Sequence, residues 1–146
     1  MNKQQFITII FGLLISFTQL YSQNKNGWEP VYLQVTGANT MDGVDASFRL
    51  GKCNNENVVF IKFINHNDYS VKLEWFDAVF TQELKWINKD EERSKKNLLI
   101  PAGAEVSGDC SNTVSTVLMI NLKSFVADKK EFKRYSSFQL NVLAVQ

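Results

Sequence analysis

Few side chains of this chain could carry catalytic chemistry, and its only histidine is the first to consider. His66 stands in the polar segment 65–68, which reads Asn-His-Asn-Asp. Asn and Asp favour turns because they tolerate a left-handed backbone and hydrogen-bond to their own main chain. A general base, in contrast, must be held against its nucleophile and oriented by a third group. We therefore predict that His66 is a solvated turn residue and not a catalytic base.

Paired carboxylates would be needed for a glycoside hydrolase, at roughly 5 Å in retaining enzymes and further apart in inverting ones. Glu74 and Asp77 are close in sequence, but three positions along a strand place two side chains on opposite faces. Asp90, Glu91 and Glu92 lie among lysines in the charged segment 88–97, which is typical of an exposed loop. Carboxylate hydrolysis therefore stays the least favoured alternative, and we expect no enzyme activity.

Metal and cofactor motifs are weak or missing in the sequence. Residues 42–45 read Asp-Gly-Val-Asp and offer oxygen ligands for calcium, but Asp-Gly is first of all a turn signal and the EF-hand spacing is missing. One histidine cannot complete a zinc site once two cysteines are paired. The sequence has no phosphate loop, nucleophile elbow or dinucleotide fingerprint. We expect neither a metal nor a cofactor.

Aromatic side chains are the remaining candidates for contact with a ligand. Trp75 is in phase with Val71 and Leu73, which predicts a place in the core. Trp86 differs because it lies beside the highly charged segment. An exposed tryptophan can form a platform for a sugar ring or an anchor at a protein interface. Trp86 is therefore the single candidate binding residue.

The two cysteines, Cys53 and Cys110, are predicted to form a disulfide, because an even pair in an exported chain is more often bridged than catalytic. Closing a loop of 57 positions (110 − 53) would restrict the unfolded chain by about 4 kcal/mol in the chain-entropy model. The alternative is two buried thiols, because a bridge needs Cα atoms within roughly 7 Å.

The N-terminal residues predict the compartment in which the protein functions. Lys3 precedes an apolar run over residues 6–17 and a polar segment over 18–22, the pattern of a secretory signal peptide. The run is shorter than the about 20 residues that span a membrane, so we expect cleavage after Ser22 and no stable membrane anchor. The expected compartment is the periplasm, the cell surface or the medium.

The expected mature chain, residues 23–146, has the size and charge of one neutral domain. Its 124 residues (146 − 22) suit a single core. Its 15 basic residues (16 − 1) balance 15 acidic ones, which gives no electrostatic basis for binding nucleic acid.

Period-two alternation of apolar residues dominates from Trp28 onward and predicts short strands. The first strand would contain Val31, Leu33 and Val35, and a later one is expected over residues 44–50, with Val44, Ala46, Phe48 and Leu50 on one face. The other strands are expected over residues 58–64, 69–77, 80–87, 98–100, 117–125 and 138–144.

Two of these strands are expected to lie at the centre of the fold. Residues 58–64 are apolar on both faces, which indicates a central strand, and residues 69–77 would return as its hairpin partner. Residues 128–135 could hold one helical turn. Seven or eight short strands in one domain predict an all-β fold, a single antiparallel β-sandwich of the immunoglobulin-like kind.

Several segments resemble a group of exported proteins. Leu20-Tyr21-Ser22-Gln23 looks like the end of signal sequences from the Bacteroidetes. Residues 60–67, Phe-Ile-Lys-Phe-Ile-Asn-His-Asn, together with residues 100–103 and 108–110, resemble small exported β-sandwich proteins of that group that have no assigned activity. The resemblance implies export and a sandwich fold, and it carries over no catalytic or binding residue.

These observations favour a non-enzymatic protein-interaction or envelope assembly module, with an unknown protein or glycan as its partner. The alternatives are a small carbohydrate-binding domain with an exposed aromatic contact and, less favoured, the carboxylate hydrolase. An exposed edge strand would favour the first, two coplanar exposed aromatic rings the second, and a cleft with two buried acids the third.

Overall fold

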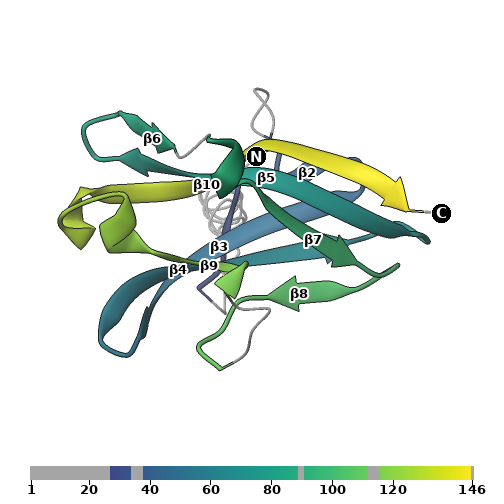
Figure 1. The fold of residues 1–146 in the computed structure, drawn as a ribbon, viewed down its shortest axis with the longest axis horizontal. Coiled ribbons are helices and arrows are strands. Elements are labelled where there is room, and N and C mark those ends of the chain that lie inside the picture. Colours follow the sequence, from purple (N-terminus) through teal and green to yellow (C-terminus); the bar gives the residue numbers. More distant parts are fainter. Residues whose placement is uncertain (1–26, 34–37, 89–90, 112–115, 146) are drawn as a thin grey trace, which may run out of the picture.

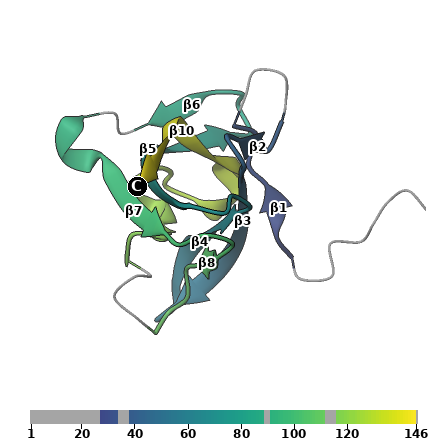
Figure 2. The ribbon, with the colours of Figure 1, turned by 90° about the vertical axis from the view of Figure 1, so that its right-hand side faces the viewer.

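The computed structural model describes residues 27–33, 38–88, 91–111 and 116–145. In these residues ten strands form two antiparallel sheets that pack face to face (Figure 1, Figure 2). The first sheet contains β1 (Glu29–Pro30), β2 (Thr40–Met41), β3 (Val44–Cys53), β4 (Glu56–Asn65), β8 (Glu105–Ser107) and β9 (Met119–Asn121). The second sheet contains β5 (Ser70–Thr81), β6 (Trp86–Asn88), β7 (Lys96–Ile100) and β10 (Phe132–Val145). The predicted antiparallel β-sandwich is confirmed.

Short edge strands raise the strand number above the seven or eight expected. β1 and β2 border β3 with two residues each, and β8 and β9 border β4 with three each. The strand expected around Val31, Leu33 and Val35 is wrong in its bounds, because β1 ends at Pro30. Val31 is buried and donates its N–H to the carbonyl of Ala46, while Val35 lies outside the described residues.

β4 and β5 are not hairpin partners, which corrects the sequence prediction. β3 occupies one edge of β4 and β8 with β9 occupy the other, so β5 has no free edge there and joins the second sheet. The fully buried Asn65 fixes the crossing, because its amide donates to the carbonyls of Tyr69 and Pro101 at 2.9 and 3.0 Å. The predicted turn after β4 is thereby confirmed, with Asn65 as its buried anchor.

β5 is the central strand of the second sheet. β10 pairs with one edge of β5, and β6 and β7 pair with the two ends of the other edge. The separate strand expected over residues 80–87 is wrong, because β5 continues to Thr81 and the chain then turns into β6. Leu84 has a φ of +62° in this turn.

The core lies between the inner faces of the two sheets. Val71, Leu73 and Trp75 are fully buried on β5, and the Trp75 ring meets Phe63 edge-on at 5.1 Å between centroids. The core position predicted for Trp75 is therefore confirmed. The inward alternation predicted for β3 holds for Val44, Ala46 and Phe48 but not for Leu50, which is 38% exposed.

The C-terminal part differs from the prediction in length and register. Only β9 and the 3-10 helix η3 (Leu122–Ser124) form over residues 117–125, although Leu118, Ile120 and Leu122 are buried as the pattern indicates. The 3-10 helix η4 (Lys129–Glu131) supplies the expected helical turn. β10 then shifts register between Phe138 and Asn141, where Gln139 has a φ of +52°.

The charged segment contains the 3-10 helix η1 (Glu92–Ser94). Glu91, Glu92 and Arg93 are exposed, as predicted, whereas residues 89–90 lie outside the described residues. The predicted signal peptide over residues 1–22 also lies outside them. Within the described part of the chain, no helix has the length and apolar character needed to cross a membrane.

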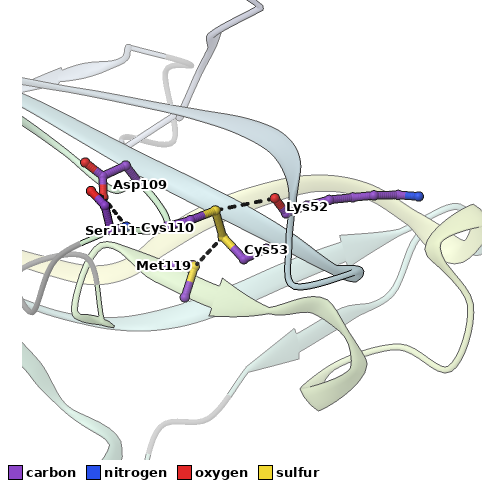
Figure 3. The surroundings of a disulfide bond; sticks show 6 residues. All are labelled: Lys52, Cys53, Asp109, Cys110, Ser111 and Met119. Carbon is purple, nitrogen blue, oxygen red and sulfur yellow. Dashed lines mark hydrogen bonds between the residues drawn. A yellow bond between two sulfur atoms is a disulfide. The ribbon is translucent and has the colours of Figure 1, made fainter.

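A disulfide joins Cys53 and Cys110, with their Cα atoms 5.6 Å apart, which confirms the predicted pair (Figure 3). The bridge ties the end of β3 to the loop after β8. Cys53 belongs to a small cluster with Val58 and Phe60 on the outer face of the first sheet, and Met119 packs against it. A disulfide is typical of proteins from oxidising compartments.

We expect labelling of free thiols in the denatured, unreduced protein to be negligible, because both sulfur atoms are in the bridge. The same protein after reduction should bind two labels per chain, which mass spectrometry counts. Two labels without reduction would contradict the disulfide.

Candidate binding site

A groove crosses the outer face of the second sheet, at the ends of β5, β6 and β10. It has a volume of about 260 Å³ and is lined by Ala78, Trp86, Asn88, Ser136 and Phe138. We call it the outer groove. Figure 1 shows β6 beside the ends of β5 and β10 that form it.

The strand register explains why a groove forms here. Ala78 of β5 lies opposite Ser136 of β10 and Asn88 of β6, so three small or short side chains form one row. Side chains on one face of a strand recur every second residue, so the rows on either side of this one contain the bulky Phe76 and Phe80 of β5. A row of small residues between two aromatic rows leaves a trough across the sheet.

Phe138, opposite Phe76, forms one side of the outer groove. Phe80 lies between Trp86 of β6 and Arg134 of β10 on the other side. The Trp86 side chain is 50% exposed, and its ring lies 4.8 Å from that of Phe80. Trp86 is exposed as expected, and its role in binding stays a prediction.

Arg134 makes this side of the groove cationic. Its guanidinium carbon lies 4.9 Å from the Phe80 ring centroid, 5.5 Å from that of Trp86 and 5.6 Å from that of Tyr32. Arg134 Nε is buried without a hydrogen-bond partner, and no carboxylate in the described part of the chain pairs with this guanidinium. Lys133 Nζ lies 5.5 Å from the Phe80 centroid. We call Phe80, Trp86, Lys133 and Arg134 the cationic wall.

Trp86→Ala should cost only about 1 kcal/mol of unfolding free energy, because the exposed indole contributes one aromatic contact and one cation–π contact. Urea titration followed by circular dichroism would measure the cost. A cost of several kcal/mol would show that Trp86 is a structural residue.

Apart from the outer groove, a polar centre buried between the two sheets surrounds Asp77. One carboxylate oxygen of Asp77 accepts hydrogen bonds from Tyr135 Oη at 2.7 Å and from Trp75 Nε1 at 3.2 Å. The other oxygen pairs with Lys96 Nζ at 2.7 Å, and this ammonium also donates to the carbonyl of Val117 at 2.7 Å. The centre therefore links β5, β10 and β7 to the chain beside β9.

Glu74 does not join Asp77, as its position on the opposite face of β5 predicts. Glu74 pairs instead with Lys72 and Lys95, at 2.6 and 3.4 Å. A cavity of about 250 Å³ beside Asp77 is also lined by Lys96, Thr116 and Asn121, and Asp77 is the one acidic side chain in its described lining. The hydrolase alternative requires two acids, and the described lining of this cavity supplies one.

Burial and the negative charge of Asp77 raise the pKa of Tyr135 well above its usual value of 10.0. Tyr135 therefore ionises at a lower pH in the unfolded chain than in the folded chain. The contribution of Tyr135 to stability is complete below about pH 10 and is lost as the pH rises toward the folded pKa.

We expect Tyr135→Phe to flatten the loss of unfolding free energy above about pH 10 relative to the wild-type protein. Denaturant titrations at a series of alkaline pH values would measure both slopes. Equal slopes would contradict the assignment of this pKa.

His66 and the Asp42-Gly43 pair lie in the connections between strands. Asp42 and Gly43 have φ values of +47° and +75° in the turn between β2 and β3, so the turn interpretation of the Asp-Gly pair is confirmed. His66 is exposed, and its Nε2 lies 2.8 Å from Asp45 Oδ2. Burial would raise the pKa of Asp45, but the hydrogen bonds from Thr40 and His66 and the charge of His66 outweigh burial and lower it.

Comparison with known proteins gives one structural likeness. No family model matches the chain, and no curated protein matches it. Among solved structures, the chain is similar to a member of the DUF1425 family from Shewanella sp. pv-4, with 13% sequence identity, a TM-score of 0.42, and coverage of 68% of this chain and 75% of that one.

Proposed function

We propose that this protein is an exported, non-enzymatic binding module whose contact surface is the outer groove with its cationic wall. The observation that carries the proposal is the half-exposed Trp86 at the groove, beside Arg134, which pairs with no acidic side chain among the described residues. Exposed aromatic and arginine side chains are the types that most often dominate binding energy at contact surfaces.

Export is supported by two independent features. Residues 1–22 have the composition of a signal peptide, and the disulfide is typical of an oxidising compartment. Both features support work in the periplasm, at the cell surface or in the medium. Membership of an immunoglobulin-like group from the Bacteroidetes stays a prediction.

Protein interaction through the edge of β10 is the second candidate function. β10 is 14 residues long and pairs only with β5 among the described strands, so its other edge is a template for an added strand. Leu143 and Val145 are exposed on this strand. A Leu143→Lys variant would weaken binding at this edge and leave binding at the outer groove unchanged.

Binding of the purified protein to envelopes of the cells that produce it tests the first candidate. Trp86→Ala should lower the bound fraction, because it removes one side of the groove. Leu84→Ala is the matched control, since Leu84 is exposed in the turn before β6 but does not line the groove. Equal binding by wild type and both variants would contradict the proposed function.

A further inference from the structure

We propose that the outer groove binds an acidic sugar, namely one uronic-acid unit of a glycan, with its ring against Trp86 and its carboxylate at Arg134. This inference rests on the proposed function and adds the chemical class of the ligand. It is carried by the shape of the groove, by the polar side chains that line it and by the charge beside it.

The groove has the size and lining for a single ring. Its volume of about 260 Å³ is below the roughly 300–1,000 Å³ of pockets that enclose a whole drug-sized ligand. Trp86 and Phe138 offer aromatic surface, and Ala78 keeps the floor low. The C–H groups on one face of a sugar ring suit an aromatic surface, and its hydroxyl groups suit the Asn88 amide and the Ser136 hydroxyl.

An extended peptide suits this groove less well than a sugar. Peptides that bind to sheets gain affinity from main-chain hydrogen bonds. Around Ala78 these groups are already used, because β5 pairs with β10 on one edge and with β6 on the other. Beside Ala78 the groove offers the side chains of Asn88 and Ser136, which favours a ligand that carries its own hydroxyl groups.

The charge beside the groove favours an anionic sugar over a neutral one. Arg134 is two residues before Ser136 and lies on the same face of β10. A guanidinium carries five N–H donors and binds a carboxylate through two parallel hydrogen bonds. Lys85, in contrast, already forms an ion pair with Glu83, so its ammonium is less available to a ligand carboxylate. A ring carboxylate would supply the acidic partner that Arg134 does not have among the described residues.

Calorimetric titration with oligosaccharides of galacturonate, mannuronate and glucuronate tests the proposal. The same oligosaccharides with their carboxylates reduced to alcohols are the neutral probes. We expect at least one acidic probe to bind more tightly than its neutral form. Arg134→Gln should weaken that binding by about 10- to 100-fold, the usual range for hydrogen bonds to a charged group, and should leave the neutral probe unaffected.

Arg49→Gln is the matched control. Arg49 also stacks on aromatic rings, those of Trp28 and Phe60, and its Nε is also buried without a hydrogen-bond partner, but it lies on the outer face of the first sheet. This variant should bind the acidic probe like the wild type. Trp86→Ala should weaken both acidic and neutral probes, and thermal melts of all variants would show that they are folded.

Equal binding of acidic and reduced probes, or no binding of any acidic probe, would overturn the inference. A glutamate-rich peptide that binds as tightly as the acidic sugar, with the same loss on Arg134→Gln, would also overturn it in favour of a protein ligand. If Trp86→Ala still lowers envelope binding in these cases, the proposed function stands. If it does not, both fail.

Discussion

Asp77→Ala is expected to lower the free energy of unfolding by about 3–5 kcal/mol, the usual cost of removing one partner of a buried ion pair. Asp77 is only 7% exposed, and the substitution would leave Lys96 without its carboxylate and Tyr135 without its acceptor. Urea denaturation at neutral pH, followed by circular dichroism, would measure the loss.

A second substitution separates the ion pair from the packing. In a Lys96→Met background the ammonium is already absent, so Asp77→Ala should cost less than it does in the wild type. A cost below about 1 kcal/mol for Asp77→Ala in the wild type would mean that water, and not the protein, satisfies Lys96.

Trp75→Ala is expected to cost about 3–5 kcal/mol, because it removes a large side chain from the centre of the core. Trp75 is 0% exposed, packs against Phe63, and donates its indole N–H to Asp77. A loss of this size is a large part of the stability of an ordinary domain, so the variant should melt at a much lower temperature.

Trp75→Phe is the matched control, since it keeps an aromatic ring and removes the N–H donor. It should cost less than Trp75→Ala. A Trp75→Ala variant as stable as Trp86→Ala would contradict the placement of the two residues on the inner and outer faces of the second sheet.

The strands could be predicted from the sequence because the alternation of apolar residues is visible within a short stretch of chain. Val71, Leu73 and Trp75 show their shared face within five residues, and the structure buries all three. The assignment of β4 and β5 to different sheets could not be predicted in this way. It depends on β8 and β9 taking the remaining edge of β4, and their residues lie 40 or more positions away.

The candidate site was predicted only in part, for a similar reason. The charged surroundings of Trp86 indicate exposure, but the groove also needs Ser136 to lie opposite Ala78, which is a matter of long-range register. Arg134 has no distinguishing pattern in the sequence. Asp77 does have a signal in the sequence, because it is the one charged residue of β5 in phase with Leu73 and Trp75.

The most direct test of the binding site is the nitrogen–proton spectrum of the labelled protein during titration with the acidic oligosaccharide. The chain has three tryptophans, so the spectrum contains three indole signals, which single Trp→Phe variants assign. We expect the signals of the Trp86 indole and of Arg134 Nε–H to shift, while that of the buried Trp75 indole stays in place. Shifts at Trp28 and Arg49, on the outer face of the first sheet, with none at Trp86, would contradict it.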